Sequence, residues 1–253
     1  MIFATDLDNT MIFSHNRITG AEDKFHCVEY YNGKPITYMS YSAIKMLASL
    51  MNKIFIVPAT TRSVEQFKRI EFFFNAEYVI ADNAGVILHN GIIHQAWDDH
   101  IQNILKRYDL EYAYKTFCRL PGLVLPPKIV DKKFVFAKSD NIDLCKEYLK
   151  CKLDTKIWQI SFYGKKIYAI PIEITKGNAL RFICEHLLPS NQTIISAGDS
   201  SLDMSMLNYS DYSIIPNDSN LSNLNINRYI KKGEGVYSAD EILKFVENML
   251  FKM

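Results

Sequence analysis

The order of β-type and helical segments along the 253-residue chain predicts an α/β fold, with a doubly wound parallel sheet and an inserted α+β segment. Short apolar runs alternate with helical patterns up to about residue 84, and the same alternation resumes after residue 170. The stretch between them has paired β-rich runs instead. We therefore expect a core domain of residues 1–84 and 171–253, and a second domain of residues 85–170.

The first half of the core carries short segments bounded by polar residues. Its patterns predict strands at residues 2–5, 54–59 and 78–81, and helices at residues 44–51 and 64–74. Ser40 or Ser42 can cap the first helix, and Ser63 the second. Asn32-Gly33 lies between two β-rich runs, which is the strongest short-range signal for a hairpin. Because it follows the first strand, this hairpin could act as a flap over a site at the end of that strand.

The inserted segment has a different pattern and a different charge. A hairpin is expected around Asn90-Gly91 and a helix over residues 97–114, followed by paired β-rich runs with a further helix between them. Residues 86–170 carry 14 Lys and Arg against 9 Asp and Glu, a charge of +5, so the remainder carries 15 against 19, or −4. A basic insert suits attraction of an anionic substrate, and a lysine-rich solvated face explains the charge equally well.

The second half of the core returns to the alternating pattern. A helix is expected from Lys176, strands at residues 193–197 and 212–215, and a last helix whose start is marked by Ser238 and Glu241 at the spacing of a capping box.

Composition excludes several classes of protein. A net charge of +1 with 48% hydrophobic residues is ordinary for a globular protein and gives no field that would recruit nucleic acid or a membrane surface. The five cysteines are scattered and form no C-x-x-C pair, which suits a reducing compartment. The N-terminus has no basic leader, and Asp6 interrupts its apolar run. We expect a soluble cytoplasmic protein without nucleic-acid or membrane partners.

Polar residues follow the predicted parallel strands or open a helix, at the sheet edge where α/β proteins bind ligands. Two carboxylates two positions apart on a strand point to the same side. Such a pair could hold a hard divalent cation, attack an electrophile and move a proton. The clusters are Asp6 with Asp8, Thr60, Lys176, and Asp199 with Asp203.

Taken in order, these motifs resemble the haloacid dehalogenase superfamily, which shows D-x-D-x-T, an apolar run ending in Thr or Ser, a Lys, and then G-D-x-x-x-D. Here they are Asp6-Leu7-Asp8-Asn9-Thr10, residues 54–60 ending in Thr60, Lys176, and Gly198-Asp199 with Asp203. The resemblance covers essentially the whole chain. It implies a Rossmann-like core with a type II cap, as in the Cof-like and sucrose-phosphatase-like branch.

The resemblance also implies roles for these residues. Asp6 would be the nucleophile that forms an aspartyl-phosphate, and Asp8 the acid and base. Mg²⁺ would be held by Asp6, Asp199 and the backbone carbonyl of Asp8, while Thr60 and Lys176 would bind phosphate. Asp203 would orient Lys176 or complete the outer shell of the metal. The supporting positions are Thr10, Thr61, Arg62 and Asn217.

Two positions depart from the usual pattern of that branch. Thr61 stands where Gly is usual, and Leu202 where an Asn is common. For Arg62, a contact with substrate and a structural ion pair are both open.

The sequence therefore predicts a Mg²⁺-dependent phosphatase acting on a small phosphorylated metabolite, with sugar phosphates as the leading class. Asp8 favours a phosphatase or a phosphomutase, because the dehalogenases of the superfamily lack an acid at that position. The alternatives are a phosphomutase of the same superfamily and a catalytically weak regulatory protein that binds phosphate.

Overall fold

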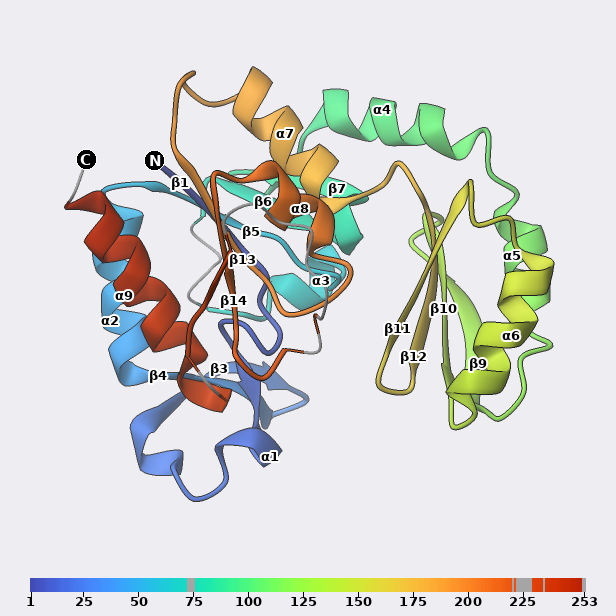
Figure 1. Cartoon of the computed structure of the whole chain (residues 1–253), viewed down its shortest axis with the longest axis horizontal. Coiled ribbons are helices and arrows are strands. Elements are labelled where there is room, and N and C mark those ends of the chain that lie inside the picture. The colour runs from blue at the N-terminus through green and yellow to red at the C-terminus, as the bar shows by residue number, and fades with distance from the viewer. Residues whose placement is uncertain (72–75, 220, 222–228, 234, 252–253) are drawn as a thin grey trace. The chain divides into compact units, whose positions relative to one another are not determined.

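The computed structural model describes residues 1–71, 76–219, 221, 229–233 and 235–251 (Figure 1). The chain divides into two compact units, Met1–His94 with Lys176–Met253, and Gln95–Thr175. The first dividing point lies beyond the expected 84/85, because the strand that begins at Val86 pairs within the first unit, and the second lies at 175/176 where 170/171 was expected. That the second unit acts as a cap stays a prediction.

The first unit is built on a parallel sheet with strand order β15-β14-β13-β1-β5, which confirms the predicted α/β fold class. Its strands are β1 (Ile2–Thr5), β5 (Phe55–Pro58), β13 (Ile194–Ala197), β14 (Tyr212–Ile215) and β15 (Tyr229–Lys231). The central strand, β1, lies between β5 and β13, and its last residue, Thr5, is in register with Pro58 and Ala197. The residues that follow these strands therefore meet at one edge of the sheet.

Helices cover both faces of this sheet, as a doubly wound fold requires (Figure 1). They are α2 (Tyr41–Met51) and α9 (Ser238–Leu250), which pack side by side, and α7 (Lys176–His186) and α8 (Met204–Tyr209), which also contact each other. Phe3 of β1, Leu47 of α2 and Ile242 of α9 lie in one buried cluster. This hydrophobic core supports the strands whose carboxyl ends carry the polar residues.

One predicted strand departs from the parallel sheet. β6 (Tyr78–Ala81) contacts β5 through a parallel bridge between Ala59 and Ile80, and otherwise pairs antiparallel with β7 (Val86–His89), which continues into β8 (Ile92–Ile93). In β5 the N–H groups of Phe55 and Ala59 point to β1, so the nitrogen of Pro58 faces β6. Because proline has no N–H, it removes a ladder hydrogen bond there.

The predicted hairpin is present and belongs to a three-stranded antiparallel sheet, while its action as a flap stays a prediction. The sheet consists of β2 (Phe13–Ser14), β3 (Phe25–Tyr31) and β4 (Lys34–Ser40), with α1 (His15–Ile18) and the 3₁₀ helix η1 (Glu22–Lys24) between β2 and β3. Asn32 and Gly33 both have positive φ, 49° and 73°, as a tight hairpin turn requires. At its end, the Ser40 hydroxyl accepts the N–H of Ala43 and caps α2, which confirms one of the two predicted caps.

Two helix predictions in the core are wrong in detail. α3 covers only Val64–Phe67: it has the Ser63 cap, but Ile70 forms an antiparallel bridge with Glu29 instead of a helical turn. Phe74, assigned to the same helix, lies outside the described residues. The Ser238 hydroxyl donates to the carbonyl of Gly235, so it does not cap α9. The remaining 3₁₀ helices are η2 (Asp82–Ala84) and η3 (Gly235–Tyr237).

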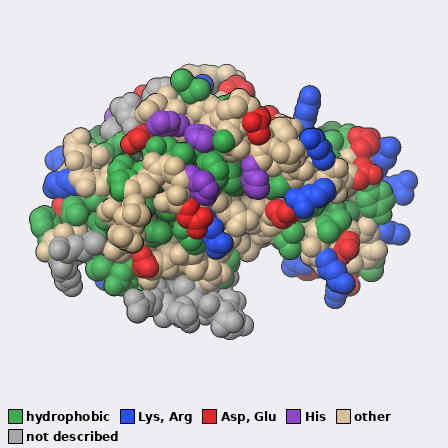
Figure 2. Space-filling view, turned by 90° about the horizontal axis from the view of Figure 1, so that it is seen from above, with side chains coloured by type: hydrophobic (Ala, Val, Ile, Leu, Met, Phe, Trp, Pro, Cys, Tyr) green, Lys and Arg blue, Asp and Glu red, His purple; other side chains and the backbone are tan. Residues whose placement is uncertain are grey.

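The second unit is an antiparallel sheet of order β11-β12-β10-β9 with helices packed on it. Its elements are α4 (Gln95–Leu105), α5 (Leu110–Phe117), β9 (Leu123–Val130), β10 (Phe134–Ser139), α6 (Ile142–Lys152), β11 (Trp158–Tyr163) and β12 (Lys166–Pro171). The helix expected over residues 97–114 is two helices, because the Asp109 side chain accepts the N–H of Tyr112 and starts α5. Figure 2 shows Lys and Arg side chains of this unit on the molecular surface.

Within the described part of the chain, none of the helices combines the length and the apolar character needed to cross a membrane.

Candidate active site

Three carboxylates gather at the carboxyl ends of β1 and β13. Asp6 follows β1, and its backbone N–H donates to the carbonyl of Ala197 at the end of β13 at 2.9 Å. Asp199 and Asp203 come from the loop between β13 and α8. All three are buried, and one oxygen from each lies within 4.8 Å of the others. A set of oxygen donors of this kind is suited to a hard divalent cation.

Lys176, the first residue of α7, bridges two of these carboxylates. Its Nζ lies 2.6 Å from Asp6 Oδ1 and 2.6 Å from Asp203 Oδ1, and its side chain is only 1% exposed. Burial opposes the charge of Lys176, but Asp203 and Asp6 outweigh that effect and raise its pKa above the ordinary value. For Asp6, burial raises the pKa and Lys176 acts in the opposite direction. The two carboxylates therefore stabilise the protonated, positively charged form of Lys176.

Asp203 is itself held from its other oxygen. Asp203 Oδ2 accepts the N–H of Ser200 at 3.0 Å and its hydroxyl at 2.8 Å. This leaves Asp203 with few rotamers, so it fixes the ammonium group of Lys176. The structure thus brings Asp6, Lys176, Asp199 and Asp203 together, as the order of the motifs predicts.

Two glycines permit these contacts. A Cβ at Gly198 would lie 2.5 Å from the Cβ of Asp203, and a Cβ at Gly177 would lie 2.3 Å from the carbonyl oxygen of Ser205. The Gly177 N–H also donates to the Ser205 hydroxyl at 2.9 Å, which ties the start of α7 to α8. Sequence reasoning did not assign Gly177 a role, although its place directly after Lys176 was a usable signal.

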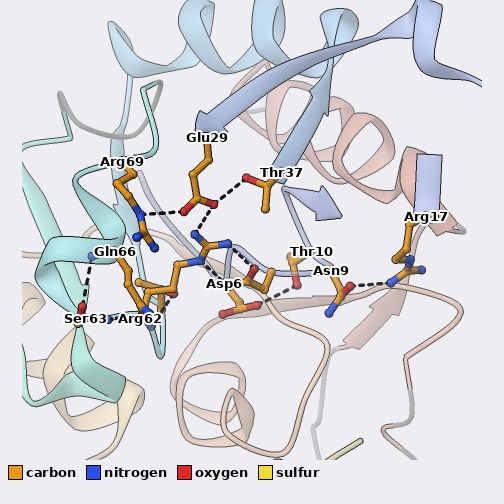
Figure 3. Close-up of polar contacts among 12 residues, drawn as sticks. Asp6, Asn9, Thr10, Arg17, Glu29, Thr37, Arg62, Ser63, Gln66 and Arg69 are labelled. Carbon is orange, nitrogen blue, oxygen red and sulfur yellow. Dashed lines mark hydrogen bonds and ion pairs between the residues drawn. The ribbon is translucent and has the colours of Figure 1, made fainter. Parts of the chain in front are cut away.

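Asp8 belongs to a second polar group centred on Arg62, which Figure 3 shows beside Glu29. Arg62 donates from Nε to Asp8 Oδ2 at 2.8 Å and from Nη2 to Asp8 Oδ1 at 2.7 Å, a bidentate pair. Its third nitrogen, Nη1, donates to Glu29 Oε2 at 2.6 Å. Burial opposes the charge of Arg62, but Asp8 and Glu29 raise its pKa above the usual value. Of the two possibilities for Arg62, the structure shows the ion pair.

Glu29 was missed by sequence reasoning. It sits on β3, where the pairing with β4 shifts register between Cys27 and Glu29, and as a result Val28 and Glu29 are both buried. A β-bulge of this kind redirects a side chain without leaving a sequence signature. Glu29 Oε1 accepts from Arg69 Nε at 3.2 Å and Oε2 from the Thr37 hydroxyl at 3.0 Å.

The threonines of the first two motifs are close to these groups. Thr60 is fully buried, its backbone N–H donates to Ile80, and its hydroxyl accepts the N–H of Arg62 at 3.1 Å. Thr10 is also buried, and its hydroxyl lies 3.5 Å from Asp6 Oδ2.

The remaining predicted positions are more peripheral. Thr61 is half-buried and its backbone is outside the left-handed region, so this loop does not require glycine there. Leu202 is buried. Asn217 is exposed, and its N–H donates to the carbonyl of Gly233. The turn that carries Asn217 is tied to the first motif through Arg17, which pairs with Asp218 and donates to Asn9.

The fold and this site define a class: α/β proteins with two aspartates after the first strand, and a lysine and a Gly-Asp loop placed against the first of them. Residues 123–232, which include Lys176, Asp199 and Asp203, match the family model of haloacid dehalogenase-like hydrolases. This match confirms the predicted resemblance to the haloacid dehalogenase superfamily over that part of the chain. The sequence matches no curated protein.

Solved structures with the same fold cover nearly the whole chain. The sucrose-phosphatase of Synechocystis sp. PCC6803, in complex with sucrose and phosphate, is 16% identical, with a TM-score of 0.66 over 98% of this chain and 97% of that one. The C-terminal domain of Candida albicans trehalose-6-phosphate phosphatase is 12% identical, with a TM-score of 0.62 over 98% and 92%. The subclass IIB sugar phosphatase BT4131 is 14% identical, with a TM-score of 0.58 over 98% of both chains.

Proposed function

We propose that this protein is a Mg²⁺-dependent phosphatase that hydrolyses a small phosphorylated metabolite, with sugar phosphates as the first class to test. The observation that carries the proposal is Asp6, buried against Lys176 and near Asp199, with a second aspartate two residues further on. Solved structures with the same fold include a sucrose-phosphatase and a trehalose-6-phosphate phosphatase, which supports the substrate class.

In the first half of the reaction, a carboxylate oxygen of Asp6 attacks phosphorus. We assign the attack to Oδ2, because Lys176 lies 2.6 Å from Oδ1 whereas the Thr10 hydroxyl makes only a long contact of 3.5 Å with Oδ2. The bond between phosphorus and the ester oxygen breaks, and Asp8, in its protonated form, gives its proton to that leaving oxygen. The products are the free alcohol and an aspartyl-phosphate on Asp6.

In the second half, water attacks the phosphorus of the aspartyl-phosphate. Asp8, now a carboxylate, takes a proton from this water, and the bond between phosphorus and Asp6 breaks to release inorganic phosphate. Lys176 and Thr60 bind the equatorial phosphoryl oxygens, by charge and by hydrogen bond. Asp203 keeps Lys176 in place throughout, because it pairs with Lys176 and, unlike Asp6, forms no bond to phosphorus.

The residues at this edge of the sheet fit a magnesium ion. Asp6, Asp199 and the carbonyl of Asp8 would supply hard oxygen ligands, and Mg²⁺ needs few protein ligands because it keeps several waters. Asp203 is less suited, because Lys176 and Ser200 occupy its two oxygens. When bound, the ion reduces the repulsion between an anionic nucleophile and an anionic phosphoryl group.

The test is phosphate release from a panel of sugar phosphates, nucleotides and an activated aryl phosphate, with Mg²⁺ and with a chelator. We expect turnover that requires the metal, is lost in Asp6→Asn, and is retained in Asp23→Asn, which makes the same chemical change at an exposed position. Sustained phosphate release excludes a dedicated phosphomutase. Absence of turnover on every substrate, in a folded protein that binds Mg²⁺, would overturn the proposal in favour of the mutase or the regulatory protein.

A further inference from the structure

Glu29 is a charged side chain with no solvent contact, on strand β3 and outside the superfamily motifs. Its side chain is 0% exposed, whereas the Asp8 carboxylate, on the other side of Arg62, is 43% exposed. Desolvating a carboxylate is unfavourable by several kcal/mol unless charges and hydrogen bonds offset it. Here Arg62, Arg69 and the Thr37 hydroxyl supply that compensation.

Several local features converge on this carboxylate. The register shift in β3 turns the side chain of Glu29 inward, and a backbone bridge from Glu29 to Ile70 brings the neighbouring Arg69 alongside. Figure 3 shows three side chains directed at Glu29. Arg69 comes from the segment after α3, Arg62 from the loop after β5, and Thr37 from strand β4. Because a buried ion pair is weak evidence for stability, this assembly calls for another role.

That role follows from the geometry of Arg62. Its Nη1 is fixed by Glu29, and its Nε and Nη2 are directed at the two oxygens of Asp8. The guanidinium group is planar, so fixing one nitrogen sets the direction of the other two. Each carboxylate oxygen can accept more than one hydrogen bond, so pairing with Arg62 does not by itself use up the acceptor capacity of Asp8.

We propose that Glu29 is a positioning residue, which acts through Arg62 to hold the half-exposed carboxyl group of Asp8 in place for proton transfer to the leaving oxygen. The inference rests on the proposed phosphatase function. Displacing a reacting group by about 1 Å lowers rates by about 100-fold, so the loss of Glu29 should reach the chemistry although Glu29 touches no substrate.

The test compares two esters that differ in their need for an acid. The leaving group of a sugar phosphate is an alkoxide, which is a poor leaving group and must be protonated. The leaving group of p-nitrophenyl phosphate is a stable phenolate, which leaves without an acid. In Glu29→Gln we expect kcat/KM for the sugar phosphate to fall at least about tenfold more than kcat/KM for the aryl phosphate, within the range of general acid catalysis. Glu65→Gln is the matched control, since Glu65 is exposed in the neighbouring helix α3.

Thr37→Val provides a milder second variant if Glu29→Gln does not fold. It removes one hydrogen bond to Glu29 and keeps its charge, so we expect a smaller loss with the same preference for the aryl ester. An equal loss on both esters, or no loss, would overturn the inference while the phosphatase function stands. No turnover of either ester by the unmodified protein would overturn both.

Discussion

The candidate site has two sides, each built on a cation between two carboxylates. On the lysine side, Lys176 joins Asp6 and Asp203, and all three side chains are less than 10% exposed. On the arginine side, Arg62 joins Glu29 and Asp8, and Asp8 is 43% exposed. Asp6, the proposed nucleophile, is thus almost completely buried, whereas Asp8, the proposed acid and base, is paired with Arg62 and partly exposed to solvent.

This difference matches what each step requires. A nucleophile surrounded by fixed charges needs no reorganisation when the phosphoryl group arrives. A group that gives a proton to one molecule and takes it from water must exchange partners, which half-exposure allows. Breaking the two sides one at a time tests this comparison.

The largest effect is expected on the lysine side. Lys176→Met leaves Asp6 and Asp203 buried without their cation, and removing one partner of a buried pair destabilises proteins by about 3–5 kcal/mol. Turnover should also fall below detection. Urea unfolding with a chelator present measures the first effect. A loss of stability below about 1 kcal/mol would show that these carboxylates do not depend on Lys176.

A second change reaches the lysine side through packing alone. Gly198→Ala places a Cβ 2.5 Å from the Cβ of Asp203, so the backbone must shift and displace Asp203 from Lys176. Overpacking of this kind is unfavourable by about 1–3 kcal/mol, and we expect about 2 kcal/mol with reduced kcat. Thermal unfolding and steady-state kinetics check this. Unchanged stability and kcat would mean that the loop can accommodate a Cβ at residue 198 without displacing Asp203.

The equivalent change on the arginine side should be milder for stability. In Arg62→Met, Asp8 turns to solvent, and Glu29 keeps Arg69 and Thr37. We expect a loss of about 1.5 kcal/mol, the size of a hydrogen bond to a charged group. Urea unfolding of Arg62→Met and Lys176→Met under the same conditions compares the two losses of stability directly. If Arg62→Met destabilises as much as Lys176→Met, the two sides do not differ in the way their burial indicates.

The two sides also differ in how far the sequence predicted them. Asp6, Lys176, Asp199 and Asp203 belong to motifs at strand ends or a helix start, and the parallel register of β1 and β13 brings them together. The burial of Glu29 depends on a bulge in β3, and the amino-acid sequence around Glu29 does not indicate which residue such a register shift turns inward.

The errors in the fold have similar causes. The helices around Ile70 and over residues 97–114 are expected from periodicity alone, but a tertiary bridge ends the first early and a local cap divides the second. Ile70 is taken up by a bridge to Glu29, and Asp109 starts a new helix. β6 is joined to the parallel sheet through an isolated bridge next to Pro58. Proline lacks an N–H, and this removes a ladder hydrogen bond to whichever strand lies beside it, which the sequence alone does not identify.

The smallest effect is expected at Thr61, between the second-motif threonine and Arg62. Its backbone does not need the left-handed region, so Thr61→Gly relieves no strain and mainly adds freedom to the unfolded chain. We expect a loss of stability below about 1 kcal/mol and kcat/KM within about threefold of the unmodified protein, since the contacts of Thr60 and Arg62 are made by other atoms. Denaturant unfolding and the phosphate-release assay measure both quantities. A gain in kcat/KM of tenfold or more would instead show that the Thr61 side chain obstructs substrate, and the loop beside Arg62 would then limit the arginine side.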